Sequence, residues 1–190
     1  MELLYITPIG WAQNAVKDID SFLQDHADAE RKVANMCLSL IAKYPNRTEI
    51  IDELIQISVE ELLHFKQVYN LIKYRGNQLN GVFQKDPYIK GIMSIVRSDS
   101  DEIFMDRLII ASIAELRGSE RFKLISKVVD DPKIAKFYAN LHLQELEHIE
   151  SFIKMAKIYF DDELVDKRTQ IILHKEAEIC SSLPWRSAIH

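Results

Sequence analysis

The sequence contains few of the residues that build turn-rich, disulfide-bonded or membrane-spanning proteins. Its 190 residues include only two Cys, five Gly and five Pro. So few turn residues disfavour an all-β fold with many hairpins. Cys37 and Cys180 form no Cys-x-x-Cys pair, which excludes a zinc-ribbon or rubredoxin-type module. No apolar run reaches the roughly 20 residues that a transmembrane helix needs.

The sequence also lacks an excess of positive charge. The formal net charge is −5, which disfavours a protein that binds nucleic acid simply by neutralising phosphates. The segment Met1–Pro8 has neither the basic region nor the apolar run of a secretory signal. We therefore expect a cytoplasmic protein without a membrane anchor. The length predicts a single domain over residues 1–190, with its core at about 18–160.

What the sequence does contain is helical periodicity. Apolar residues recur at steps of three and four, which predicts four long helices at about 18–44, 48–75, 100–129 and 131–160. A further helix is expected at about 162–180, with short helices after Pro8 and around 88–97. A short loop joins the first long helix to the second, and another joins the third to the fourth. Residues 76–99 form one long crossover between these two pairs. The expected fold is all-α, a four-helix bundle with one long crossover and short N-terminal and C-terminal helices.

Two helices carry the same short motif, Glu-x-x-His. Glu61 and His64 form the first copy, and Glu145 and His148 form the second. Residues three apart share one face of a helix, so each motif presents a carboxylate and an imidazole together. A lone Glu precedes each motif by about one helix length. Glu30 comes 61 − 30 = 31 residues before the first, and Glu115 comes 145 − 115 = 30 residues before the second.

All six residues fall on the apolar seam of their own helix. The second helix shows this most simply, because Glu61 and His64 continue the series Leu54, Ile57 with steps of three and four. Buried Glu is rare unless it is paired or bound to metal. A chance surface pair explains one motif easily, and a metal-free polar network remains an alternative for the set. The four remaining histidines lack this spacing and are expected to be surface or structural residues: His26, His142, His174 and His190.

Four carboxylates and two imidazoles suit hard or borderline metal ions. Such a set on four helices is typical of sites that hold two iron or two manganese ions. Thiolate ligands are absent from the set, which argues against structural zinc. A reduced iron pair can deliver two electrons together to O₂. The outcome then depends on access to the site: hydroxylation of a bound C–H bond, oxidation of iron, or reduction of peroxide.

With this ligand set, the sequence resembles the ferritin-like superfamily and, within it, the bacterial tRNA hydroxylases of the MiaE type. The resemblance extends over about residues 18–160. The stretches that carry it are residues 25–32, 60–65, 114–122 and 145–148. The resemblance implies that iron is held by Glu30, Glu61, His64, Glu115, Glu145 and His148.

The resemblance also implies a reaction. The family hydroxylates the isopentenyl group of 2-methylthio-N6-isopentenyl-adenosine beside the tRNA anticodon. One atom of O₂ enters an allylic C–H bond and the other leaves as water. The two electrons come from a reductase that this chain does not contain. The expected partners are therefore the anticodon region of tRNA and a reductase, and the oligomeric state stays open.

A tRNA substrate requires phosphate contacts. A basic run near Glu115 is the candidate, formed by Arg117, Arg121, Lys123 and Lys127. A solvated helical face is the alternative explanation of this run.

Two other classes of function remain open on the sequence alone. One is an iron-handling or peroxide-scavenging protein of the ferritin or rubrerythrin kind, which shares the ligand set. The other is a metal-free helical binding module. Metal analysis separates the module from the rest, and assembly into a cage identifies a ferritin.

Overall fold

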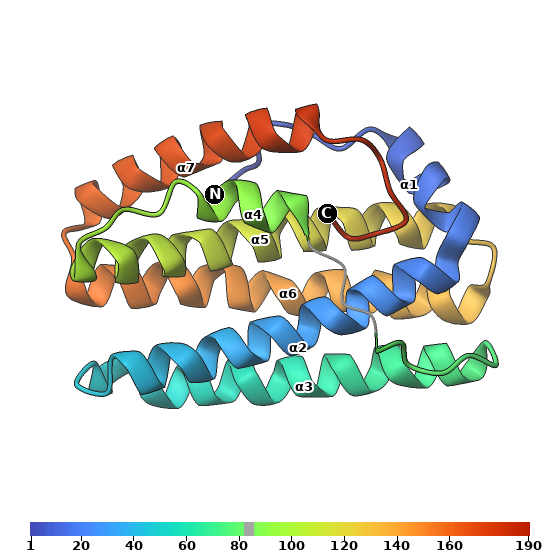
Figure 1. Ribbon diagram of the computed structural model, residues 1–190, viewed down its shortest axis with the longest axis horizontal. Coiled ribbons are helices and arrows are strands. Elements are labelled where there is room, and N and C mark those ends of the chain that lie inside the picture. The colour runs from blue at the N-terminus through green and yellow to red at the C-terminus, as the bar shows by residue number, and fades with distance from the viewer. Residues whose placement is uncertain (82–85) are drawn as a thin grey trace. The chain divides into compact units, whose positions relative to one another are not determined.

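The computed structural model describes residues 1–81 and 86–190, and all regular structure in this part of the chain is helical (Figure 1). The α-helices are α1 (Ile9–Ala15), α2 (Ile19–Lys43), α3 (Ile51–Tyr74), α4 (Pro87–Met93), α5 (Ser100–Val128), α6 (Pro132–Tyr159) and α7 (Asp162–Ser182). Short 3-10 turns, Val16–Asp18 and Thr48–Ile50, precede α2 and α3. The predicted helices are confirmed to within a few residues at each end. The central part of the predicted crossover, residues 82–85, lies outside the described residues.

Aspartate side chains define where five of the helices begin. Asp18, Asp86, Asp99, Asp131 and Asp161 each accept hydrogen bonds from backbone N–H groups in the first turn of the helix that follows. These N–H groups have no partner within the helix, so the carboxylate satisfies them and also favours the positive end of the helix dipole. Pro follows the cap at α4 and α6, where its missing N–H costs nothing.

The chain forms two compact units. Unit 1 consists of Met1–Asn14, Lys85–Arg186 and His190, and unit 2 consists of Ala15–Gln84 and Ser187–Ile189. Among the described helices, none is long and apolar enough to cross a membrane.

Unit 2 is a helical hairpin in which α2 and α3 pack along their length (Figure 1). Leu23 and Cys37 of α2 and Leu54 and Val68 of α3 are fully or almost fully buried on the predicted seams. Ser58 Oγ of α3 donates a hydrogen bond of 3.2 Å to the backbone oxygen of Ala34 in α2. Such a contact requires close backbone approach, which the small residues of the seam permit.

Unit 1 contains a second hairpin, made by α5 and α6, with α7 packed against both and α4 packed against α7 (Figure 1). Ser112 Oγ of α5 donates to the oxygen of Ile149 in α6 at 2.6 Å, and Ser119 Oγ donates to the oxygen of His142 at 2.8 Å. These bonds repeat in unit 1 the serine contact between the two helices of unit 2.

A buried arginine connects α5 with α7 and the N-terminal segment of unit 1. The Arg117 guanidinium donates to both carboxylate oxygens of Glu176, at 2.7 and 2.9 Å. It also donates to Thr7 Oγ1 at 2.9 Å, to Glu120 Oε2 at 2.5 Å and to the Tyr5 oxygen at 2.8 Å. All five N–H donors of the side chain are therefore used. Burial alone would lower the pKa of Arg117, but the bonds and charge of Glu176 raise it above its ordinary value.

Removal of the carboxylate that faces Arg117 tests this connection. We expect Glu176→Ala to destabilise the protein by about 3–5 kcal/mol, because an unpaired guanidinium stays buried in unit 1. Glu178→Ala is the matched control on the same helix, since its pair with Lys175 is exposed and screened by solvent. Thermal unfolding followed by circular dichroism measures both variants. Equal midpoints for the two variants would contradict a structural role for the Arg117–Glu176 pair.

Candidate metal centre

Unit 2 brings together three of the six predicted ligands. Glu30 lies on α2, and Glu61 and His64 lie one turn apart on α3. All three side chains are buried, and each offers a ligand atom within 4.8 Å of the other two. His64 Nδ1 lies 3.8 Å from Glu61 Oε2, which is close enough for both to bind one ion but too long for a hydrogen bond. The arrangement follows directly from the seam positions, because α2 and α3 pack through the faces that carry these residues.

A fourth residue of unit 2 belongs to this cluster although its spacing did not match the motif. His26 is fully buried, and its Nε2 is hydrogen-bonded to Glu30 Oε1. Burial lowers the pKa of His26 to about 3, and the nearby His64 adds to this effect. His26 is therefore neutral at ordinary pH and orients the Glu30 carboxylate. The sequence signal was the spacing of four residues between His26 and Glu30, which places both on one helix face.

Unit 1 holds the other three predicted ligands on α5 and α6. Glu115, Glu145 and His148 are all buried. His148 Nδ1 lies 3.0 Å from Glu145 Oε2, so the motif residues of α6 face each other as predicted. A proton on Nδ1 would leave the Nε2 lone pair available to a metal. Unit 1 thus carries two buried Glu and one buried His, which is the same inventory that unit 2 carries.

The donor chemistry of each set fits iron or manganese. Glu oxygen and His nitrogen are ligands of hard and borderline divalent ions. Buried carboxylates without a cation would be costly, and these Glu side chains are all less than one tenth exposed. Among the described cysteines, Cys37 is buried outside the set and Cys180 accepts a contact from Arg121 in unit 1. The set therefore has no thiolate, as the sequence predicted.

The structure corrects the predicted substrate contacts on α5. Arg117 is fully buried and all its donors are used within unit 1, so it cannot meet a phosphate on the surface. Arg121 is also buried: its guanidinium lies 4.6 Å from the ring centre of Trp11 and donates to Cys180 Sγ at 3.1 Å. Only Lys123 and Lys127 of the predicted run are exposed. Lys123 and Lys127 therefore remain predicted substrate contacts.

The fold and the repeated ligand set define a class, the ferritin-like carboxylate proteins. A solved structure supports this class: Protein 43 with aldehyde deformylating oxygenase activity, from Synechococcus, superposes with a TM-score of 0.93. It is 25% identical, and the match covers 99% of this chain and 94% of that one. The predicted all-α, ferritin-like fold class is confirmed.

The particular family follows from the sequence comparisons. Residues 2–190 match the model of the family described as tRNA-(MS[2]IO[6]A)-hydroxylase (MiaE), and the chain belongs to this family. The tRNA 2-(methylsulfanyl)-N(6)-isopentenyladenosine(37) hydroxylase of Pseudomonas putida is 31% identical over 93% of this chain and 85% of its own length. The protein of the same name from Salmonella typhimurium is 28% identical over 57% of this chain and 40% of its own length. The resemblance seen in the sequence is confirmed.

The position of His26 generates a prediction about metal affinity. We expect His26→Ala to weaken Fe²⁺ binding by about 10- to 100-fold, because residues that orient a ligand tune metal affinity by this much. An anaerobic titration of the purified protein with Fe²⁺ measures it. His174→Ala is the control, since His174 is exposed on α7. Unchanged affinity in His26→Ala, with helix content preserved, would show that Glu30 needs no such support.

Proposed function

We propose that this protein is a non-haem di-iron monooxygenase that hydroxylates the isopentenyl group of 2-methylthio-N6-isopentenyl-adenosine in tRNA. The observation that carries the proposal is the repeated ligand set, buried in both units of a chain that belongs to a family of tRNA hydroxylases. The reaction balances as R–H + O₂ + 2 e⁻ + 2 H⁺ → R–OH + H₂O. One C–H bond and the O–O bond break, and one C–O bond forms in the product.

The proposed site combines the two ligand sets. We propose that two iron ions are held by Glu30, Glu61, His64, Glu115, Glu145 and His148. Iron is the proposed metal because a reduced iron pair can deliver two electrons together to O₂, and the donor set fits iron as well as manganese. When bound, the pair supplies the electrons that activate O₂. The motif carboxylates, Glu61 and Glu145, would each supply oxygen ligands to the iron pair.

The protein residues contribute position, charge and exclusion of water. Four carboxylates offset the charge of two divalent ions, which keeps the local net charge near zero. His26 fixes the Glu30 carboxylate by its hydrogen bond. The burial of the six side chains limits the access of bulk water to the proposed site.

The proposal requires partners and a location. The substrate is the anticodon region of tRNA, which places the enzyme in the cytoplasm. The electrons come from a separate reductase, because the chain carries no Cys-x-x-Cys centre of its own. The two units together form the single functional domain proposed for residues 1–190.

Nucleoside mass spectrometry of tRNA tests the function. Cells that lack this gene are expected to lose the hydroxylated methylthio-isopentenyl nucleoside and to accumulate its unhydroxylated precursor. Wild-type protein should restore it, whereas Glu61→Ala should not, because a buried ligand of the proposed site is missing. Glu60→Ala is the matched control, since the adjacent Glu60 pairs with Gln56 in an exposed contact. An unchanged nucleoside profile in the deletion strain would contradict the proposal.

The same experiment separates the alternative class. An iron-handling or peroxide-scavenging protein uses the same donor set but has no nucleoside product. Iron binding together with an unchanged nucleoside profile would favour that class. Size-exclusion chromatography would then identify a ferritin by its assembly into a cage.

A further inference from the structure

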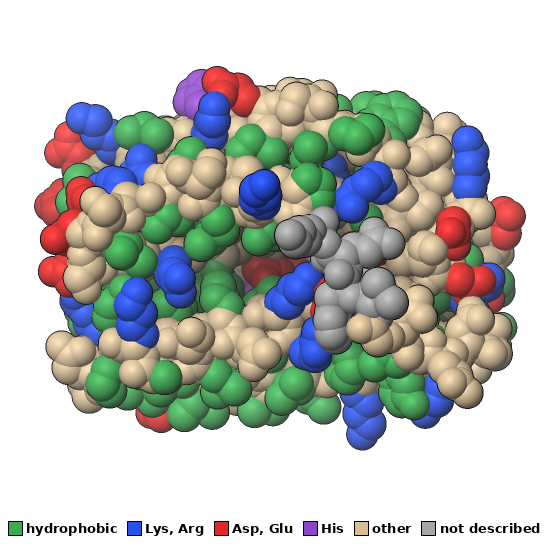
Figure 2. All heavy atoms as spheres, in the orientation of Figure 1, with side chains coloured by type: hydrophobic (Ala, Val, Ile, Leu, Met, Phe, Trp, Pro, Cys, Tyr) green, Lys and Arg blue, Asp and Glu red, His purple; other side chains and the backbone are tan. Residues whose placement is uncertain are grey.

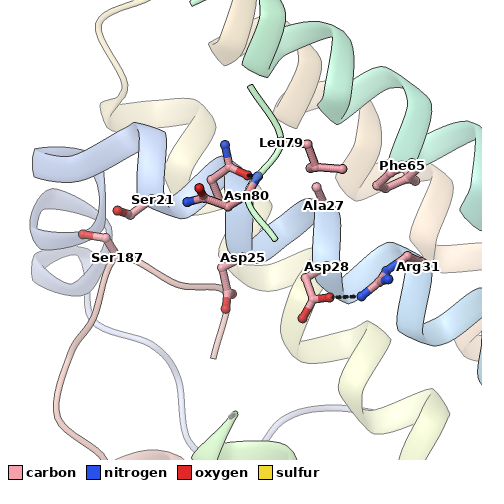
Figure 3. Close-up of a pocket in the computed structure, with 10 residues that line it drawn as sticks. Ser21, Asp25, Ala27, Asp28, Arg31, Phe65, Leu79, Asn80 and Ser187 are labelled. Atoms are coloured by element: carbon pink, nitrogen blue, oxygen red, sulfur yellow. Dashed lines mark hydrogen bonds and ion pairs between the residues drawn. The ribbon is translucent and has the colours of Figure 1, made fainter. Parts of the chain in front are cut away.

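Unit 2 contains a pocket lined by side chains of α2, α3 and the segment that follows α3 (Figure 3). Its volume is about 280 Å³. Figure 3 shows Ala27 of α2, Phe65 of α3 and Leu79 facing the same space, with Asp28 and Arg31 paired on one side. A cavity of this size is near the lower end of small-molecule sites. It suits one nucleobase better than a paired nucleic-acid helix.

The lining residues lie close to the candidate ligands along the helices. Ala27 precedes Glu30 by three residues on α2, and Phe65 follows His64 directly on α3. One helical turn rises about 5.4 Å, so the backbone of Ala27 lies within about one turn of that of Glu30. A base that enters the pocket therefore brings its substituents near this half of the proposed site.

The acidic residues of the pocket do not repel an anionic ligand strongly, because each is already engaged. Asp28 pairs with Arg31 at 2.6 Å and with Lys32 at 2.5 Å. Asp25 accepts a hydrogen bond of 2.8 Å from the backbone N–H of Ile189. The side chain of Arg31 is 41% exposed, which leaves part of the guanidinium accessible at the rim.

A row of aromatic and basic side chains continues from the pocket along α3. The rings of Phe65 and Tyr69 lie 6.5 Å apart and are almost parallel, with an angle of 9° between their planes. Lys73 Nζ lies 4.7 Å from the centre of the Tyr69 ring. Phe65 and Tyr69 are half-buried and Lys73 is exposed, so each side chain is partly open to solvent. We call these three residues the α3 stacking row.

The charge around the stacking row differs from that of the whole chain. No Asp or Glu occurs between Glu61 and Asp86, whereas Lys66, Lys73 and Arg75 fall in this interval. In Figure 2, Lys and Arg side chains lie beside hydrophobic ones over the C-terminal half of α3. Arg75 pairs with Asp20 of α2, so the local positive charge of this face comes from the exposed Lys66 and Lys73.

We propose that the α3 stacking row and the adjacent pocket dock single-stranded RNA, with one nucleobase in the pocket against Phe65. Loops are recognised by aromatic side chains that stack on splayed bases and by basic side chains that contact phosphates. The row extends roughly 12 Å from Phe65 to Lys73. This length matches several nucleotides of a loop and exceeds that of a single phosphate group. This inference rests on the proposed function and gives its RNA substrate a docking surface.

Binding of an anticodon stem-loop tests the docking surface. The RNA carries 2-methylthio-N6-isopentenyl-adenosine and a fluorescent label, and anisotropy is measured without O₂ so that no turnover occurs. We expect Phe65→Ala and Tyr69→Ala each to weaken binding by about 5- to 100-fold, the range for loss of a stacking aromatic. Lys73→Gln should reduce the slope of log affinity against log salt by about 0.7, the value for one phosphate contact on a single strand.

Matched controls come from α6. Phe137→Ala removes a half-buried aromatic, and Lys136→Gln removes an exposed charge. Neither should change RNA affinity by more than about twofold, because a surface lysine away from phosphates adds little. Iron content and helix content are measured for every variant. If Phe65→Ala loses iron because it adjoins His64, the comparison rests on Tyr69→Ala and Lys73→Gln.

The outcomes separate the docking surface from the function. Wild-type affinity in Tyr69→Ala and Lys73→Gln overturns the docking surface and leaves the tRNA hydroxylase intact. Loss of affinity only in the double variant Lys123→Gln, Lys127→Gln also overturns it, in favour of the α5 surface predicted from the sequence. A wild-type protein that does not bind the stem-loop overturns the docking surface, while the nucleoside profile decides the function independently.

Discussion

The cost of burying carboxylates is the constraint on which this structure depends. Glu30, Glu61, Glu115 and Glu145 occupy positions where an apolar residue would complete a helix seam. A buried anion is tolerated only beside a compensating charge or metal. Each unit places a His beside its carboxylates on the same seam, and the proposed iron supplies the compensating charge. The four carboxylates thus share one proposed role, which is to bind metal.

Other buried charges of unit 1 are compensated by ion pairs. Arg117 and Glu176 neutralise each other between α5 and α7. Asp106 has a similar role, since it accepts bonds from both Arg97 and Arg168. Charge in the core is thus divided between ion pairs that connect elements and carboxylate–imidazole sets that fit a metal.

The sequence predicted the features that depend on local rules. The predicted starts of the third and fourth long helices agree with the caps at Asp99 and Asp131. The phase of Glu61 and His64 on the apolar seam correctly predicted that both are buried. Tertiary partners were beyond such rules. The basic run on α5 looked solvated, yet Arg117 pairs with a residue 59 positions away, and nothing in local spacing encodes that contact. The α3 stacking row was missed for a related reason, because periodicity does not show which flank of a helix borders a pocket.

The Arg117 contacts also affect the order in which the protein can be completed during synthesis. Its partners extend from Tyr5 to Glu176, so unit 1 cannot satisfy this side chain until almost the whole chain has left the ribosome. Unit 2 needs little beyond residues 15–84 for its hairpin. Since compact units generally fold as they emerge, the hairpin with Glu30, Glu61 and His64 has time to form before its counterpart exists. During translation the nascent chain thus carries unit 2, with three of the six proposed ligands, before unit 1 is complete.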